Sequence, residues 1–287
     1  MAIDKGSAPS DSELAAKLLR HAGEVAQLIR AQGLGALNAG SQVKTNTADF
    51  VTAADLAAEK YIFEELRQAR PGDSILGEEG AGYRGTSGRC WVIDPVDGTY
   101  NFASGSTYWC AALALTGPSP DLGISTLGTT TDRLTTAEVL LGAVYQLDED
   151  KLWLGGTTQP ATLNGQPIHV DTRQELGELS AGSYIHPGWL AEPRASVPWK
   201  SAAQLPATLR MLGSGSCDLA RVAQGELGVW FQHSCPSWDW LPGKGIVEAA
   251  GGDTAVVHVN GLHWYVAGPS GAVAQLKVAL ELGVLPA

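Results

Sequence analysis

Two stretches in the first quarter of the chain carry apolar residues at helical spacing. The first helix is expected to begin with a capping box at residues 10–13 and to end near Gly33. The second is expected to stop at Pro71-Gly72, because proline cannot continue a helix. The apolar faces comprise Leu14, Leu18, Val25 and Leu28 in the first helix and Leu56, Ile62, Phe63 and Leu66 in the second. Both helices are interpreted as packing elements.

Short apolar runs in the rest of the chain predict strands. They lie at residues 74–77, 90–93, 108–116, 140–145, 152–154, 228–232 and 262–266, with a hairpin turn at 162–168. Further apolar helices are predicted at 243–252 and 271–282. Alternating helix and strand signals with hairpins indicate an α/β fold in which helices cover sheets.

Carboxylates gather at the ends of three of these apolar segments. The run at 90–93 is followed by Asp94-Pro95-Val96-Asp97-Gly98-Thr99, where Pro95 is expected to end sheet pairing and Gly98 to open a turn and a helix. The run at 74–77 leads into Glu78-Glu79, and Asp239 lies between two tryptophans. An ordinary surface turn would explain one such cluster but not three. Carboxylates are ligands for Mg²⁺, and free N–H groups at a helix start attract phosphate.

Composition and charge limit the partners and the cellular location that the chain can have. The chain has 287 residues, 44% of them hydrophobic, and a net charge of −11, which disfavours a nucleic-acid backbone or an anionic membrane as partner. No apolar run reaches the length of a transmembrane helix, and the first residues lack the features of a signal peptide. The widely spaced cysteines at 90, 110, 217 and 235 favour reduced thiols and a cytoplasmic location. Residues 1–9 are expected to form a disordered tail.

Taken in order and spacing, Gly77-Glu78-Glu79, the motif at 94–99 and Trp238-Asp239 resemble the signature motifs of the inositol monophosphatase family of Mg²⁺-dependent, lithium-sensitive phosphatases. The likeness runs from about Gln42 to the C-terminus. It implies a layered αβαβα sandwich of the inositol monophosphatase and sugar phosphatase type, and a homodimer. One domain would span 10–287, with a metal- and phosphate-binding lobe at about 10–165 and a substrate lobe at about 166–287.

The resemblance also implies a role for each motif residue. One Mg²⁺ would be held by Glu78, Asp94 and the carbonyl of Val96, a second by Asp94, Asp97 and Asp239, and a third, weaker one near Glu78 and Glu79. Glu78 and Thr99, backed by Asp55, would orient the attacking water. Phosphate would be held by the N–H groups of Gly98 and Thr99 and approached by Lys44, and the substrate's alcohol would face Gly213, Ser214 and Gly215. From spacing alone, helix N-capping explains Asp55 and the 213–215 loop better.

Substrate choice is the least determined feature. Where the family usually has a glutamate that binds substrate hydroxyls, this chain has Gln232, which favours a polyol phosphate such as inositol 1-phosphate over histidinol phosphate. Fructose-1,6-bisphosphate and 3′-phosphoadenosine 5′-phosphate stay open, and Tyr100 could narrow the pocket. Residues 117–136 look like an insertion. A non-catalytic, metal-binding regulator is the alternative from another class, whereas zinc at His233 and Cys235 lacks the required spacing.

Overall fold

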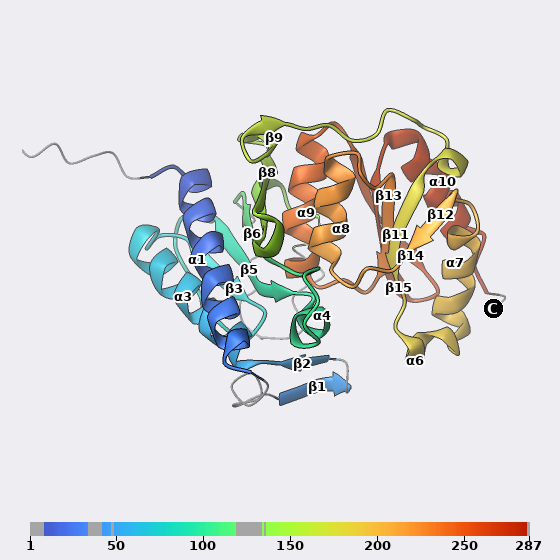
Figure 1. Ribbon diagram of the computed structural model, residues 1–287. Helices are drawn as coiled ribbons and strands as arrows, with labels where there is room; N and C mark the ends of the chain where they lie inside the picture. Colours follow the sequence, from blue (N-terminus) through green and yellow to red (C-terminus); the bar gives the residue numbers. More distant parts are fainter. Residues whose placement is uncertain (1–8, 34–41, 47–48, 119–133, 135, 286–287) are drawn as a thin grey trace, which may run out of the picture.

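The chain folds into five stacked layers of alternating helices and sheets (Figure 1). The computed structural model describes residues 9–33, 42–46, 49–118, 134 and 136–285, with the backbone alone for the stretches within 42–51. Helices α1 (Asp11–Ala31) and α3 (Ala53–Ala69) form one outer layer, and α7 (Pro193–Ala203) with α10 (Ser270–Glu281) form the other. Two sheets enclose α8 (Gly215–Ala223) and α9 (Ser237–Ala249) between them. This confirms the αβαβα arrangement.

The first sheet has eight strands in the order β10-β9-β8-β7-β6-β5-β3-β4. Its strands are β3 (Ser74–Gly77), β4 (Gly82–Tyr83), β5 (Cys90–Asp97), β6 (Cys110–Thr116), β7 (Val139–Gln146), β8 (Lys151–Gly156), β9 (Gln159–Leu163) and β10 (Gln166–Pro167). Short helical turns, α4 (Thr99–Ala103) and η1 (Leu147–Glu149), follow β5 and β7. Only β3 and β5 pair in parallel; the other neighbours are antiparallel, as expected for hairpin connections.

The second sheet has five strands in the order β12-β11-β13-β15-β14. Its strands are β11 (Ser180–Tyr184), β12 (Thr208–Arg210), β13 (Val229–His233), β14 (Asp253–Val259) and β15 (Leu262–Gly268). The first three are parallel, and β14 and β15 form an antiparallel hairpin. Short helices η2 (Leu176–Glu178) and α6 (Pro187–Leu190) flank β11. Separately, β1 (Gln42–Asn46) and β2 (Asp49–Val51) form a two-stranded ribbon.

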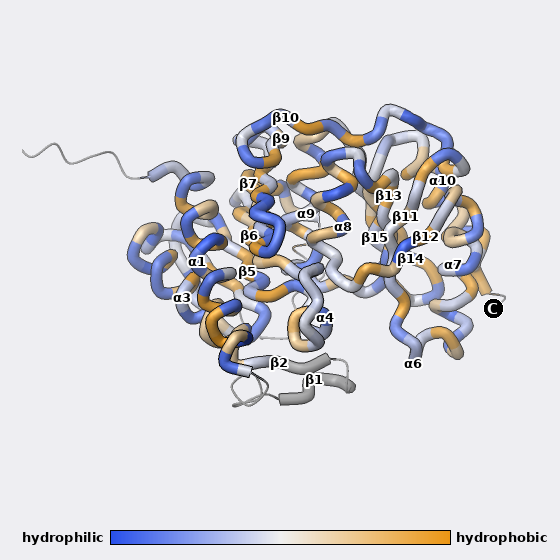
Figure 2. Tube along the Cα trace, viewed as in Figure 1, coloured by the Kyte–Doolittle hydropathy of each residue, from blue (hydrophilic) through white to orange (hydrophobic). Residues whose placement is uncertain are grey.

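Apolar clusters fill the spaces between the layers, and Figure 2 shows the hydrophobic residues concentrated along the inner strands and helices. The central layer is anchored by α9, whose Trp240 stacks on Trp230 at 6.0 Å between ring centroids and meets Tyr265 edge-on at 5.2 Å. Both partners belong to the second sheet, and on its other side α9 packs on the first sheet. The start of α9 is therefore held between the two sheets. Of the helices that the structure describes, none has the length and hydropathy needed to cross a bilayer.

The structure corrects several sequence-based expectations about element boundaries. Strand β5 continues to Asp97 instead of ending at Asp94, and α9 begins at Ser237 rather than near Gly243. Proline is present at both places: a bulge accommodates Pro95 in the strand, and α9 continues through Pro242, which lies inside the helix. Strands β11, β12 and β14 were not predicted. Most of the 117–136 segment and of the 1–9 tail lies outside the described residues.

The buried faces of the first two helices also differ from the prediction. Leu28 is 66% exposed and Leu56 is 43% exposed. In α1 the buried face contains small residues, including Ala15, Ala22 and Ala26, that allow the helix to lie close to the sheet and to α3. A pattern of large apolar residues misses such a face because alanine carries little periodic signal.

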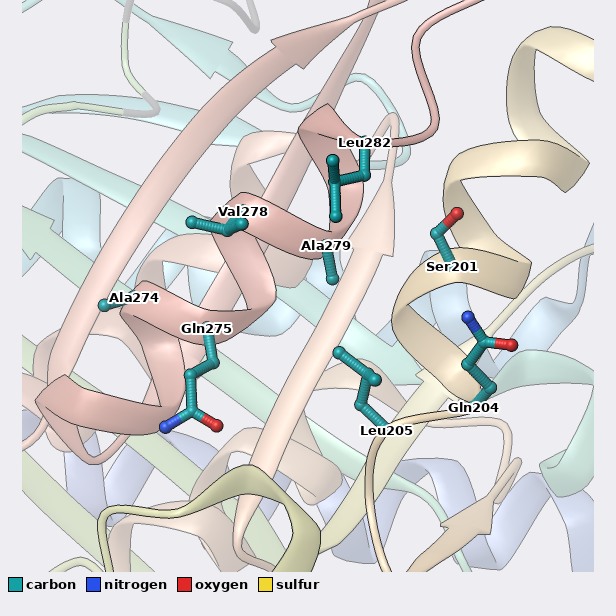
Figure 3. Close-up of a pocket in the computed structure, with 8 residues that line it drawn as sticks. All are labelled: Ser201, Gln204, Leu205, Ala274, Gln275, Val278, Ala279 and Leu282. Atoms are coloured by element: carbon teal, nitrogen blue, oxygen red, sulfur yellow. The ribbon is translucent and has the colours of Figure 1, made fainter.

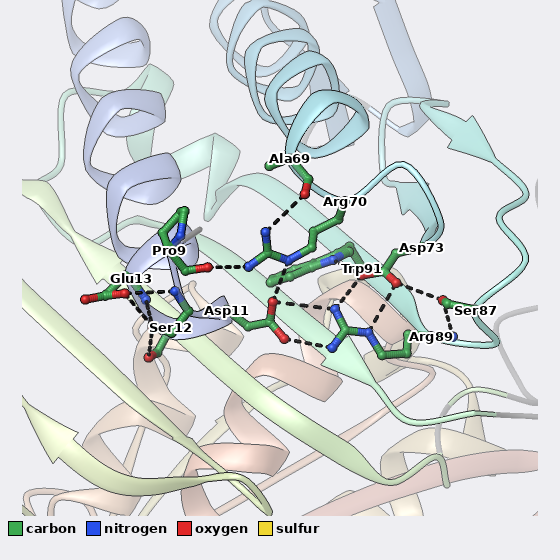
Figure 4. A network of polar contacts seen from close by, with 11 residues as sticks. Pro9, Asp11, Ser12, Glu13, Ala69, Arg70, Asp73, Ser87, Arg89 and Trp91 are labelled. Atoms are coloured by element: carbon green, nitrogen blue, oxygen red, sulfur yellow. Dashed lines mark hydrogen bonds and ion pairs between the residues drawn. The ribbon is translucent and has the colours of Figure 1, made fainter. Parts of the chain in front are cut away.

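A polar network ties the start of α1 to the first sheet (Figure 4). Asp11 accepts hydrogen bonds from Arg70 and Arg89, at 2.8 Å each. The buried Asp73 accepts from Arg89 at 2.6 Å, Ser87 at 2.8 Å and Trp91 Nε1 at 3.0 Å. Burial works to raise the pKa of Asp73, but the hydrogen bonds from Arg89, Ser87 and Trp91 and the charge of Arg89 outweigh it and lower that pKa below its usual value.

We expect the Asp73→Asn variant to be less stable than the wild type at neutral pH. As the pH is lowered, its free energy of unfolding should fall less than that of the wild type. A carboxyl whose pKa is lowered by folding stabilises the protein above the pKa of the unfolded chain, and this contribution is lost as the pH falls through the folded value. The loss at pH 7 should be about 1–3 kcal/mol, the scale of hydrogen bonds to a buried charge. Urea unfolding at pH 7 and pH 3 measures it, with the exposed Asp253→Asn as control. An equal difference at both pH values would contradict the prediction.

A groove of about 550 Å³ lies between α7 and α10 (Figure 3). Its walls include Gln204, Leu205, Gln275, Val278 and Leu282, and no ionisable side chain is among its lining residues. A phosphate ester needs positive charge or converging N–H groups. This groove is therefore not the candidate active site, which lies on the other face of the second sheet, where α8 and α9 begin.

Candidate active site

Asp94 and Asp97 lie on a bulge at the carboxyl end of β5, an inner strand of the first sheet. Asp94 pairs with Ala112 and Asp97 with Cys110, so the bulged strand has one more residue between these pairs than its partner β6. Pro95 lacks an N–H for the ladder, and a bulge is where a strand tolerates that loss. The two carboxylates are only 1% and 8% exposed. The bulge thus places two acids inside the protein rather than on a surface turn.

Other carboxylates surround Asp94. Burial, with the nearby charges of Glu78, Asp97 and Asp239, raises the pKa of Asp94 well above its usual value. One of its oxygens, Oδ1, is buried and has no hydrogen-bond partner among the described residues. Acids from three separate motifs therefore act electrostatically on Asp94. Carboxylates are the donors that a hard divalent cation prefers. Within the described ranges, however, no three His, Cys, Asp or Glu side chains meet as a closed ligand set.

The start of α8 binds Asp97. Ser214, the N-cap of this helix, donates its hydroxyl to Asp97 Oδ2 at 3.0 Å, and the backbone N–H of Ser216 donates to the same oxygen. Burial raises the pKa of Asp97, and these hydrogen bonds partly oppose that rise. The 213–215 loop is therefore a helix N-cap, as its spacing indicated. It is also the contact that brings the second half of the chain to the acids of the first.

Glu59 holds the turn that carries Glu78 and Glu79, and the sequence analysis missed it. From α3, its buried carboxylate accepts the N–H groups of Glu79 and Ala81, at 2.8 Å each. A Cβ on Gly77 would lie 2.3 Å from Glu59 Oε2, so only glycine lets the strand approach. Asp55 and Glu59 are four residues apart on one buried helix face. This four-residue spacing of two acids is the signal in the sequence that could have identified Glu59.

Asp55 makes the contacts that both interpretations of the sequence require. Thr52, three residues earlier, caps α3, and Asp55 completes the capping box by accepting from the N–H and hydroxyl of Thr52. Its other oxygen lies 3.2 Å from the hydroxyl of Thr99, which is also 3.0 Å from the carbonyl of Val96. Burial, opposed by hydrogen bonds from Thr52 and reinforced by the charge of Glu78, raises the pKa of Asp55 to about 6.

Two glycine turns from distant parts of the chain approach each other at this site. Gly98 and Gly213 both have φ near +89°, a conformation that glycine adopts without strain. A Cβ on Gly98 would lie 3.1 Å from the carbonyl of Gly213. Asn101 holds the two turns together, because its amide donates to the carbonyls of Leu212 at 2.7 Å and Tyr108 at 2.9 Å. The sequence analysis did not single out Asn101.

The remaining predicted site residues lie on the second sheet, on α9 and on β1. Asp239 is in the first turn of α9, and a Cβ on Gly215 would lie 4.0 Å from its carbonyl. Gln232 is half-buried near the end of β13. His233 packs between Trp189 and Trp264, and burial lowers its pKa to about 4, so it is a packed core histidine. Lys44 is in β1, but its side chain is outside the described residues.

Residues 11–284 match the sequence profile of the inositol monophosphatase family. The chain belongs to this family. This is a family of phosphatases, in the hydrolase class. An inositol-1-monophosphatase of Rhizobium meliloti (strain 1021) is 33% identical over 207 residues, 71% of each chain. The Nus factor SuhB of Xylella fastidiosa (strain Temecula1 / ATCC 700964) is 30% identical over 211 residues, 73% of this chain and 70% of that protein.

Solved structures of the inositol monophosphatase family share the fold. The extragenic suppressor protein suhB from Bartonella henselae superposes with a TM-score of 0.78, covering 95% of this chain and 99% of the other, at 23% sequence identity. At that identity the likeness concerns the fold alone. It agrees with the layer order described above.

Proposed function

We propose that this phosphatase hydrolyses the phosphate ester of a small polyol, with inositol 1-phosphate as substrate and Mg²⁺ as cofactor. The observation that carries the proposal is the buried Asp94, whose pKa is raised by burial and by three neighbouring carboxylates and whose Oδ1 has no partner in the described part of the chain. Such a cluster is destabilising unless a cation neutralises it. If these acids had only a structural role, the loss of stability caused by burying them together would have no explanation.

The candidate ligands form three sets, two of which share Asp94. Glu78, Asp94 and the carbonyl of Val96 would hold one Mg²⁺, Asp94, Asp97 and Asp239 a second, and Glu78 with Glu79 a weaker third. When bound, Mg²⁺ supplies positive charge that stabilises the attacking and leaving oxygens of an in-line displacement at phosphorus. Ser214 and the N–H of Ser216 keep Asp97 Oδ2 occupied. The other oxygen of Asp97 would then be the one that holds a cation.

Thr99 orients the water that attacks phosphorus. Its hydroxyl proton points to Asp55 or to the carbonyl of Val96, at 3.2 and 3.0 Å. The hydroxyl oxygen can therefore only accept from the water, which directs a water lone pair toward phosphorus. Glu78 is the second acceptor. The N–H groups of Gly98 and Thr99 at the start of α4 hold the phosphate oxygens, and no protein nucleophile is required.

The nature of the alcohol is the second part of the proposal. The name of the Rhizobium meliloti relative supports inositol 1-phosphate. Gln232 and the loop from Gly213 to Gly215 would contact the alcohol, and Lys44 would lie near the phosphate. The name of the Xylella fastidiosa relative, a Nus factor, supports a non-catalytic role as the alternative. Retention of Glu78, Asp94, Asp97, Asp239, Asp55 and Thr99 favours catalysis. A homodimer and a cytoplasmic location stay predictions.

We expect phosphate release from inositol 1-phosphate to disappear after chelation, to return with millimolar Mg²⁺ and to be suppressed by lithium. A site of carboxylates binds Mg²⁺ loosely, and a small monovalent ion in one position supplies too little charge. Phosphate release is measured on a panel that also contains histidinol phosphate, fructose-1,6-bisphosphate and 3′-phosphoadenosine 5′-phosphate. Full activity after thorough chelation would show that phosphate release does not require Mg²⁺. Absence of turnover on the whole panel would favour the non-catalytic regulator.

A further inference from the structure

Helix α8 carries a stripe of polar side chains although every residue from Ser216 to Ala223 is buried. Ser214, Asp218 and Arg221 are spaced i, i+4 and i+7, so they lie on one face of the helix. Asp218 is 2% exposed and Arg221 is 4% exposed. A buried polar side chain is destabilising unless it is hydrogen-bonded, and apolar residues would fill the same space without that requirement. Packing alone therefore does not explain the stripe.

The first and last members of the stripe bind two strands of the first sheet. Strand β5 ends, β6 begins and β7 ends at the same end of this sheet, because neighbouring strands are antiparallel. Ser214 donates its hydroxyl to Asp97, the last residue of β5, at 3.0 Å. Arg221 donates to the amide oxygen of Gln146, the last residue of β7, at 2.9 Å. Helix α8 is thus attached across the end of the sheet that carries the candidate acids.

Between these two contacts, Asp218 binds Tyr108, which leads into β6. The Tyr108 hydroxyl donates to Asp218 Oδ1 at 2.6 Å. The guanidinium of Arg221 lies over the same ring, 4.8 Å from its centroid, at a distance that allows cation–π attraction. Burial and the charge of Asp218 raise the pKa of Tyr108, so the phenol keeps the proton that it donates. The side chain of Tyr108 is therefore held by α8.

The backbone of Tyr108 contacts the turn at Gly98 that begins α4. Its carbonyl accepts from the amide of Asn101 at 2.9 Å. A Cβ on Gly98 would lie 3.3 Å from the same carbonyl oxygen. Gly98 follows Asp97 directly in the chain, and its N–H is one of the groups proposed to hold phosphate. Tyr108 therefore joins this turn, through its backbone, to α8, through its side chain, and its length fixes how far apart the two lie.

We propose that Tyr108 is a positioning residue of this phosphatase, which acts through Asp218 to keep α8 in place and so holds Asp97 ready for a divalent cation. With α8 fixed, the hydroxyl of Ser214 and the N–H of Ser216 stay within reach of Asp97 Oδ2. The carboxylate of Asp97 then keeps one orientation. The inference rests on the proposed function and adds to it a residue that acts through another.

The test compares divalent-cation binding in Tyr108→Phe and in the wild type. Mn²⁺ is the probe, because it prefers the same oxygen ligands as Mg²⁺ and its free form is measured by electron paramagnetic resonance without substrate. The Mg²⁺ concentration that gives half the maximal rate of phosphate release from inositol 1-phosphate is the second readout. We expect the dissociation constant for Mn²⁺ and the half-saturating Mg²⁺ concentration to rise about 3- to 10-fold, the effect of one lost hydrogen bond. A smaller amount of folded enzyme would lower the maximal rate but would move neither value.

Tyr145→Phe is the matched control. It also removes a tyrosine–aspartate hydrogen bond from the first sheet, since the hydroxyl of Tyr145 bonds to Asp150 at 3.0 Å, but Tyr145 packs in the apolar cluster beneath α1. Its Mn²⁺ binding and Mg²⁺ dependence should match the wild type. A second comparison tests the route through α8: in the Asp218→Ala background, Tyr108→Phe should cause no further change.

Unchanged Mn²⁺ binding and Mg²⁺ dependence in Tyr108→Phe would overturn the inference. An equally large change in Tyr145→Phe, or an equal effect of Tyr108→Phe with and without Asp218, would also overturn it. A wild-type protein that binds no Mn²⁺, or that keeps its full rate after thorough chelation, would instead overturn the proposed function. Thermal unfolding in chelator shows that the variants compared are folded.

Discussion

Asp94→Asn should release phosphate at least about 100-fold more slowly than the wild-type enzyme, since one charged group that stabilises the transition state is worth that much. Asp94 is the shared member of the two candidate ligand sets, and an amide carries no charge to hold a cation. The side chain is 1% exposed and keeps its shape on substitution, so no packing is lost. Initial rates at saturating Mg²⁺ and substrate measure the effect.

The same variant should be no less stable than the wild type when metal is chelated. Glu78, Asp97 and Asp239 all repel a charge on Asp94, and the neutral amide relieves that repulsion. Thermal unfolding in chelator should therefore show an equal or higher midpoint, whereas added Mg²⁺ should stabilise the wild type alone. Asp253→Asn, at the start of β14 and exposed, is the matched control. A variant that keeps more than a tenth of the wild-type rate, only about 1.4 kcal/mol, would refute the shared-ligand assignment.

Gly142→Ala should destabilise the whole molecule and inactivate it. Gly142 lies in β7, and a Cβ there would be 2.1 Å from the carbonyl of Pro242 in α9. Neither backbone can yield by rotating a side chain, so α9 must move away from the first sheet. We expect a loss of about 3 kcal/mol in the free energy of unfolding, at the upper end for overpacking.

Activity should fall with Gly142→Ala because α9 carries Asp239 in its first turn. Urea unfolding and phosphate release are measured on the same preparation. Gly72→Ala is the control, since its Cβ would meet only Ser87, at 3.9 Å. Wild-type activity in a folded Gly142→Ala variant would show that the position of Asp239 does not depend on this contact.

The candidate acids were predictable because each belongs to a short motif at the end of an apolar run. Local chemistry identifies such motifs without knowledge of the fold. Glu59 and Asn101 were not predictable in this way. Glu59 accepts the backbone N–H of Glu79, and Asn101 donates to the backbone carbonyl of Leu212. No local pattern records which backbone a side chain will meet.

The sequence by itself determined that helices and strands alternate, where most of them lie, and which acids were available for a metal. The tertiary structure decided which faces are buried, as the exposed Leu28 and Leu56 show. It also decided that Pro95 is absorbed in a bulge and that Asp97 is bound by the start of α8. Periodicity and motif chemistry depend on neighbours a few residues away. Burial and close backbone approach depend on contacts between residues that are far apart in the chain, from about twenty positions, as for Glu59 with Glu79, to more than a hundred, as for Asn101 with Leu212.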